Sequence, residues 1–193
     1  MSLTKVMDPM AGSGASAAKA SIAQDHPIGA LVYEDGSLAN EIMLRCADRL
    51  RSCGAKLAGM IQMNNAQNMG QRCQMYLQDL MSGHVVRISE DRGRYASGCR
   101  LDLTAFTQAT HLCQQSLSSH PDIVFINKFG RQEAQGNGLR AVIAEAAMVS
   151  IPLLIGVPRR NLREFQLYIS GPVVELALDD DAVLRWCRAR THL

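Results

Sequence analysis

Short runs of apolar, largely β-branched residues recur along the chain and predict strands buried inside a sheet. Between these runs, apolar residues often return every three or four positions, which is the spacing of one helix face. Strands are predicted at 28–33, 56–63, 122–126, 151–157 and 173–176. Helices are predicted at 37–52, 102–117, 138–149, 161–168 and 179–190.

Polar residues and glycine at the ends of the predicted helices support these boundaries. Ser37 and Asp102 stand where a helix N-cap is expected, and Gly54 follows the first helix. Asn161 and Glu164 have the spacing of a capping box, which predicts a side-chain cap for the short helix that follows.

The middle of the chain breaks the alternation of strands and helices. Segments 74–80 and 84–89 alternate polar and apolar residues around a Ser-Gly pair at 82–83, and this pattern predicts a β-hairpin. The stretch 64–72 is polar, and 90–101 is a long loop. Loops of that length in a compact domain are typical of functional or mobile segments.

Strands that alternate with helices indicate βαβ units and a mainly parallel sheet. We therefore predict a three-layer α/β fold with an inserted antiparallel hairpin. Residues 27–193 are expected to form this one domain, because that length buries a sizeable core. Residues 1–26 are rich in Gly, Ala, Ser and Met and lack the apolar stretch of a secretory signal, so we expect a disordered tail.

Composition narrows the classes of function. The 193 residues include 20 basic and 18 acidic side chains, a net charge of +2 that gives no general basis for binding nucleic acid. No apolar run approaches the roughly 18 residues of a membrane span, so no membrane insertion is expected. The six cysteines form no CxxC pair and no close cluster with the five histidines. Reduced thiols in a cytoplasmic protein therefore fit better than a metal site or a disulfide framework.

The most informative stretch is 122–140, where a strongly apolar strand ends in polar residues and leads into a helix. Open α/β sheets bind ligands where their central strands end in this way. A solvated loop with ordinary surface charges would explain the same composition. The candidate ligand-binding residues of this stretch are Asn127, Lys128, Arg131, Gln132 and Glu133.

The turn after the first strand is where a nucleotide-binding fold would keep its phosphate loop. Residues 33–41 contain one glycine, no lysine and three carboxylates. Two acidic side chains beside a triphosphate would each cost about 1–4 kcal/mol, and the helix dipole offsets only about 0.3–1 kcal/mol. We therefore expect no functional phosphate loop. Glu34 and Asp35 either compensate the helix dipole at the surface or hold a divalent cation or a donor-rich ligand.

Basic residues follow both late strands. Lys128 and Arg131 come after the first of them, and Arg159 and Arg160 after the second. If the two strands are neighbours, these side chains converge on one edge and can hold a small oxyanion or phosphate. Ordinary surface charges explain the same pattern equally well.

Catalytic chemistry is not visible in the sequence. No Gly-x-Ser-x-Gly motif occurs, and His84 and His111 have no readable relation to a nucleophile. Gly136-Asn-Gly138 matches only part of a dinucleotide fingerprint. No catalytic residue and no cofactor are assigned.

Several segments of the sequence resemble an uncharacterised bacterial domain family whose genes tend to lie near molybdate-transport genes. Some members of that family have been labelled as transporter ATPase components. The resemblance covers about residues 27–190, and FGRQEAQGNGLR is its most specific mark. The matching segments are residues 29–36, 80–84, 97–102, 127–140 and 151–158.

More distantly, the layout is similar to small P-loop nucleoside-triphosphatases. In those proteins a strand ends in Asp-Glu-x-Gly, whereas Asn127-Lys-Phe-Gly130 occupies that place here, with Glu133 and Leu139-Arg140 downstream. The resemblance therefore implies a P-loop-NTPase-like fold that lacks both the acidic magnesium pair and the phosphate-loop lysine.

Three hypotheses follow. The first is a ligand-binding or regulatory protein for a small anion, linked to molybdenum by the resemblance alone, with Arg131, Arg159 and Arg160 as anion contacts and Glu133 orienting an arginine. The second is a divergent nucleotide hydrolase or transferase that holds magnesium with Glu34, Asp35 and Glu133. The third is a structural partner of a transporter or cofactor-assembly protein. A homo-oligomer is compatible with all three.

Overall fold

The computed structural model of the chain describes residues 28–63, 74–90 and 100–191. The predicted tail 1–26 and the stretch 64–72 lie outside these residues, as does most of the loop 90–101. The elements in chain order are β1 (Ile28–Tyr33), α2 (Gly36–Ser52), β2 (Leu57–Met63), β3 (Tyr76–Asp79), β4 (Val85–Arg87), α3 (Leu103–Leu117), β5 (Ile123–Asn127), α4 (Arg131–Ala134), α5 (Arg140–Met148), β6 (Leu153–Pro158), a 3-10 turn (Arg159–Asn161), α6 (Leu162–Tyr168), β7 (Val174–Leu176) and α7 (Asp180–Thr191).

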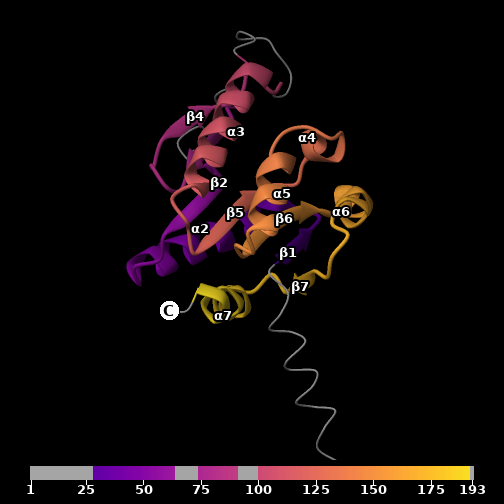
Figure 1. Cartoon of the computed structure of the whole chain (residues 1–193). Helices are drawn as coiled ribbons and strands as arrows, with labels where there is room; N and C mark the ends of the chain where they lie inside the picture. Colours follow the sequence, from indigo (N-terminus) through magenta and orange to yellow (C-terminus); the bar gives the residue numbers. More distant parts are fainter. Residues whose placement is uncertain (1–27, 64–73, 91–99, 192–193) are drawn as a thin grey trace, which may run out of the picture.

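One seven-stranded sheet runs through the domain in the order β4-β3-β2-β5-β6-β1-β7 (Figure 1). From β2 to β7 all neighbouring strands are parallel, whereas at the other edge β3 is antiparallel to both of its neighbours, β2 and β4. The predicted mixed α/β fold with an inserted hairpin is thus confirmed, and it is consistent with a P-loop-NTPase-like architecture.

Helices cover both faces of the sheet, because its central strands are apolar on both sides. In β5, Phe125 packs with the apolar residues of α2 and α7, whereas the next residue, Ile126, packs with those of α3, α5 and α6. This alternation follows from the two-residue period of a strand. The central strands therefore pack against one apolar core on each face of the sheet. The sheet and the helices on its two faces make the three predicted layers.

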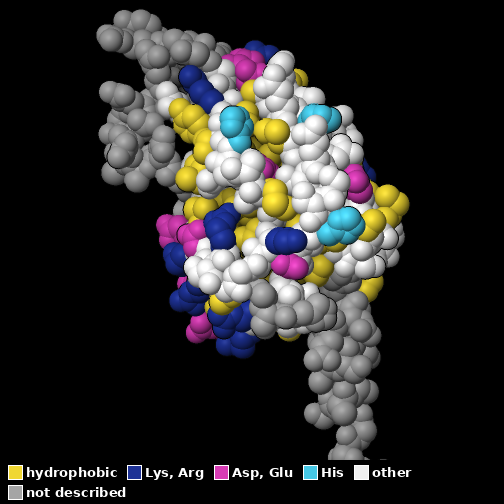
Figure 2. All heavy atoms as spheres, turned by 60° about the vertical axis from the view of Figure 1, so that its left-hand side comes forward, with side chains coloured by type: hydrophobic (Ala, Val, Ile, Leu, Met, Phe, Trp, Pro, Cys, Tyr) yellow, Lys and Arg dark blue, Asp and Glu magenta, His cyan; other side chains and the backbone are white. Residues whose placement is uncertain are grey.

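Opposite charges offset each other where α2 packs beside α7. Arg45 pairs with Asp180 at 2.9 Å and with Glu41 at 3.3 Å, and Arg49 lies 3.7 Å from Asp181. Basic and acidic side chains also lie intermixed over the face drawn in Figure 2. Within the described residues no helix is long and apolar enough to cross a membrane.

Four local predictions need correction or addition. Ser37 does not cap α2; the N-cap is Asp35, whose side chain accepts from the backbone N–H of Ser37. Asn161 does not cap α6 with its side chain; its Nδ2 donates to the carbonyl oxygen of Phe129 at 3.1 Å instead. Leu103 begins a row of apolar residues with helical spacing, which predicts burial, yet it is 58% exposed at the first turn of α3. The four-residue helix α4 was not predicted, because it is held by local hydrogen bonds from the backbone N–H groups of Gly130 and Leu139 to the carboxylate of Glu133 rather than by apolar periodicity.

Candidate functional site

A polar cavity of about 240 Å³ opens at the carboxyl ends of β1, β2 and β5, beside the first turn of α2. After β1 the chain passes to α2 on one face of the sheet, whereas after β5 and β6 it passes to α5 and α6 on the other. Such a divergence between neighbouring strands leaves a crevice, and open α/β sheets bind ligands there. The lining residues are Tyr33, Asp35, Gly36, Ser37, Asn40, Gln62, Asn127 and Lys128.

Asp35 is the N-cap of α2. Its Oδ1 accepts hydrogen bonds from the backbone N–H of Ser37 at 3.1 Å and from the Ser37 hydroxyl at 2.6 Å. These hydrogen bonds lower the pKa of Asp35, so its carboxylate is charged at neutral pH. A phosphate group placed at the helix N-terminus would therefore meet a fixed negative charge.

Two buried asparagines join α2 to the end of β5. Nδ2 of Asn127 donates to Oδ1 of Asn40, and both residues are almost fully buried, with exposed fractions of 6% and 5%. Nδ2 of Asn40 has no hydrogen-bond partner among the described residues. A buried donor without a partner costs about 1–3 kcal/mol, so this amide is suited to a ligand atom that accepts a hydrogen bond.

Lys128 provides the positive charge of the cavity. Burial is the main cause that lowers its pKa; the nearby positive charge of Arg160 lowers it further, and Glu133 opposes both. The same guanidinium acts on Tyr33, although burial dominates there and raises the pKa of that phenol to about 12. Of the predicted residues, the structure thus brings Asp35, Asn127 and Lys128 together, with the charge of Arg160 close by.

Glu34 and Arg159, predicted as members of two separate clusters, face each other. They follow the paired ends of β1 and β6, where Tyr33 lies opposite Pro158, and their charged groups are 2.9 Å apart. Both side chains are more than half exposed, so the pair contributes at most about 1 kcal/mol to stability. Arg159 therefore already has an anionic partner from the chain itself.

Glu133 has a structural role that the sequence did not reveal. Its carboxylate is buried and accepts the backbone N–H of Gly130 at 2.8 Å and that of Leu139 at 2.9 Å. Burial raises its pKa, which these backbone donors and Lys128 oppose. Gly138, at φ +61°, is pressed against this carboxylate, and a Cβ there would overlap it. Both oxygens thus bind backbone, so Glu133 does not orient an arginine as predicted.

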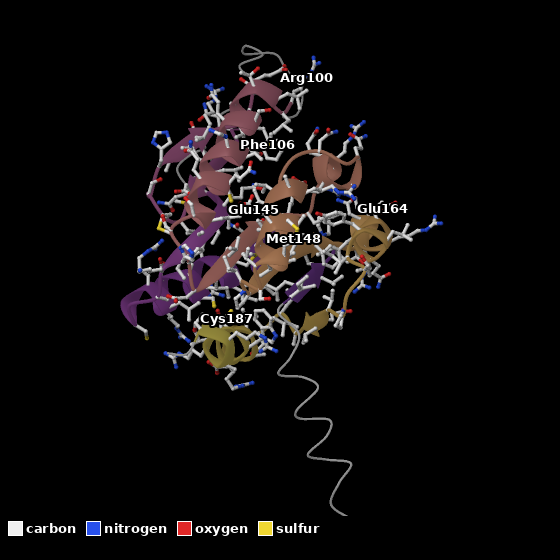
Figure 3. The ribbon with its side chains drawn as sticks, in the orientation of Figure 1. Arg100, Phe106, Glu145, Met148, Glu164 and Cys187 are labelled. Atoms are coloured by element: carbon white, nitrogen blue, oxygen red, sulfur yellow. The ribbon has the colours of Figure 1, made fainter. Side chains whose placement is uncertain are left out.

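Arg131 and Gln132 lie away from the polar cavity. Arg131 is exposed at the start of α4 and is not among the lining residues. Gln132 lines a second hollow, of about 440 Å³, between α3 and α5. Phe106 of α3 reaches into this hollow and lies against Gly138 (Figure 3). In the described part of the chain no three Asp, Glu, His or Cys side chains gather to hold a metal ion.

Among the lining residues that sequence analysis missed, Asn40 is the one with a buried amide that has no partner among the described residues. It lies on the predicted helix 37–52 but off the apolar stripe Leu38, Ile42, Cys46 and Leu50 that marked the helix. A polar residue five positions into a helix is ordinarily exposed. In the structure Asn40 is hydrogen-bonded to Asn127, 87 positions later in the chain, and no local pattern predicts that contact. The one signal in the sequence is that Asn40 lies close to the end of the first strand.

Replacing Glu133 by glutamine is expected to lower the free energy of unfolding by about 1–3 kcal/mol. The amide keeps one acceptor oxygen but turns an N–H₂ group toward the second backbone donor, which then loses its partner. Urea unfolding followed by circular dichroism measures the change. Glu164→Gln, an exposed change on α6 labelled in Figure 3, should stay within about 0.5 kcal/mol of the wild type. Equal stability of the two variants would contradict this role.

The chain folds as an α/β protein that is consistent with a P-loop-NTPase-like architecture, and its polar cavity lies at the carboxyl ends of the parallel strands. Comparison with known proteins agrees with this class. The chain belongs to the family described as Protein of unknown function (DUF2478), which matches residues 28–186.

One curated protein similar to the chain is the Molybdenum import ATP-binding protein ModC 2 of Bradyrhizobium diazoefficiens. The two are 27% identical over 161 residues, which are 83% of this chain but 18% of that protein. The chain therefore spans less than a fifth of the length of this relative. The name of the relative describes that whole protein. No solved structure matches the chain.

Proposed function

We propose that the protein is a ligand-binding or regulatory protein that holds a small oxyanion in the polar cavity and lacks ordinary nucleotide hydrolysis. The observation that carries the proposal is the unpartnered Nδ2 of the buried Asn40, which lines the same cavity as Lys128. An anionic oxygen accepts hydrogen bonds from both groups, and charge-assisted hydrogen bonds are about twice as strong as neutral ones. Arg160 adds a second positive charge nearby.

The local chemistry supports anion binding without hydrolysis. The turn 33–41 has no lysine to contact phosphates, and Asp35 places a carboxylate at the helix N-terminus. Asn127 and Lys128 stand where the resemblance to P-loop NTPases expects an acidic magnesium-binding pair. Glu133, a carboxylate further along the chain, is bound by two backbone N–H groups. The arrangement therefore favours binding over phosphoryl transfer.

The link to molybdenum rests on the similarity to ModC 2, a molybdenum import ATP-binding protein. We propose that this chain acts in a related process, through its ligand or through a partner protein of transport or cofactor assembly. Molybdenum itself need not be the ligand, because nothing in the cavity is specific to that element.

A thermal-shift panel tests the proposed function. Phosphate, sulfate, molybdate and tungstate are compared with ATP, GTP and ADP in the presence of magnesium, at constant ionic strength. At about a hundred times its dissociation constant, a ligand adds roughly 2.7 kcal/mol, which raises the Tm of a domain of this size by about 5–10 °C. We expect such a rise with at least one of the oxyanions and none with the nucleotides.

The other outcomes of the panel distinguish the rival hypotheses. A shift with magnesium nucleotides alone, together with release of phosphate, would indicate the divergent hydrolase. No shift with any compound would contradict anion binding and leave the structural partner as the better hypothesis.

A further inference from the structure

The polar cavity contains a hydrogen-bond acceptor as well as donors. Oδ1 of Asp35 accepts both hydrogen bonds from Ser37, whereas Oδ2 accepts none from any residue that the structure describes. The donors without a hydrogen-bond partner among the described lining residues are the Nδ2 of Asn40 and the ammonium group of Lys128. A ligand that satisfies every group must therefore accept hydrogen bonds and also donate one.

Tetrahedral oxyanions differ in this respect. Sulfate, molybdate and tungstate carry no proton at neutral pH, so each of their oxygens is an acceptor only. Such an oxygen facing Oδ2 of Asp35 would bring two negatively charged acceptors together, which costs free energy and leaves both without a proton to share. Hydrogen phosphate, HPO₄²⁻, keeps one O–H group and can donate it to the carboxylate, while its other oxygens accept.

We propose that the cavity selects hydrogen phosphate over fully deprotonated oxyanions, with Asp35 accepting the ligand proton and Asn40 and Lys128 donating to the ligand oxygens. This inference rests on the proposed function, because it names the kind of oxyanion that the same cavity binds. Discrimination arises mainly from the unfavourable contact with the wrong ligand, which is a common source of specificity.

The buried amide pair fixes the donor side of the cavity. Asn127 occupies Oδ1 of Asn40, which leaves the N–H₂ group of Asn40 for the ligand. Tyr33 contributes a hydroxyl that stays protonated at neutral pH, since burial raises its pKa to about 12. Of the lining residues that the structure describes, only Asp35 carries a carboxylate, so this one side chain decides whether the ligand must carry a proton.

Inorganic phosphate and the phosphate group of an ester could both provide such a ligand, and a phosphate monoester distinguishes between them. Its second pKa is about 6, so at pH 7.5 a monoester has lost the proton that inorganic phosphate keeps. Glycerol 3-phosphate is therefore expected to bind more weakly than inorganic phosphate at pH 7.5, and to approach it at pH 5.5. Tight binding of the monoester at pH 7.5 would overturn the requirement for a proton.

The decisive experiment is calorimetric titration of the full chain with phosphate, sulfate and molybdate at pH 7.5, for the wild type and for Asp35→Asn. In the wild type, phosphate should bind at least tenfold more tightly than sulfate or molybdate. Asn is as good an N-cap as Asp, so the variant should keep α2 intact. Its amide can turn an N–H₂ group toward the ligand, so sulfate and molybdate should now bind at least as tightly as phosphate.

The matched control is Asp48→Asn, which removes the same charge from an exposed position of α2 that pairs with Arg51. This variant should keep the preference of the wild type. Equal binding of sulfate and phosphate to the wild type, or an unchanged preference in Asp35→Asn, would overturn the inference while the proposed function stands. If no oxyanion binds the wild type, the proposed function fails and the inference fails with it.

Discussion

Replacing Gly59 by alanine is expected to lower the free energy of unfolding by more than about 4 kcal/mol, enough to unfold most of a marginally stable protein. Gly59 lies in β2 opposite Phe125 of β5, at φ +111°. A Cβ at this position would lie 2.7 Å from the carbonyl carbon of Phe125 and closer still to its oxygen. Neither central strand can move away, because each is buried on both faces.

Two other glycines separate steric overlap from backbone strain. Gly54 has φ +91° but no atom within 4 Å of an added Cβ, so Gly54→Ala should cost only the strain, about 1–3 kcal/mol. Gly171 has neither constraint, and Gly171→Ala should change stability by less than about 0.5 kcal/mol. Urea unfolding of the three variants gives the order. Equal destabilisation by Gly59→Ala and Gly54→Ala would show that the contact with Phe125 is unimportant.

Replacing Lys128 by methionine is expected to weaken oxyanion binding by a hundredfold or more, which corresponds to about 2.7 kcal/mol. Among the described residues that line the cavity, this side chain supplies the only positive charge. Methionine keeps the length of the stem without the charge. Because burial disfavours the ammonium form of Lys128, the free energy of unfolding should stay the same or increase.

These opposite directions distinguish loss of binding from loss of folding. Calorimetric titration with phosphate measures the first, and urea unfolding measures the second. The matched control is Lys56→Met, which removes the same charge at an exposed position just before β2, at the opposite edge of the sheet. That variant should bind phosphate as the wild type does. Unchanged affinity in Lys128→Met would remove this residue from the site.

Much of the fold was predictable because its signals are local. The apolar run at 122–126 and the alternation around 82–83 depend only on neighbouring residues, and both the strand and the hairpin are found where they were predicted. Asp102 caps α3 as expected, with its side chain accepting the N–H of Ala105 at 3.0 Å. The predicted cap by Asn161 is wrong because its side chain forms a long-range contact. It donates to the carbonyl oxygen of Phe129, 32 positions earlier, and does not accept a hydrogen bond from the N–H groups of its own helix.

The candidate site was less predictable, because its members come from distant parts of the chain. Asp35, Asn127 and Lys128 were found through their positions after strands, and the structure places them around one cavity. Asn40 was missed, since its burial depends on a partner 87 positions away. Glu133 was predicted as a site residue but was given another role. The sequence does not show whether its carboxylate accepts a nearby backbone N–H or contacts a charged side chain.

The sequence by itself determined the class of fold, the order of strands and helices, and the lack of a lysine in the turn after β1. These follow from periodicity and residue type, which act over a few positions. Only the tertiary structure decided which distant polar groups meet: the pairing of Glu34 with Arg159, and the contact of Asn127 with Asn40, which leaves Nδ2 of Asn40 without a partner among the described residues. Those contacts depend on the order in which parallel strands assemble, and that order is set by packing across the whole sheet rather than by any local pattern.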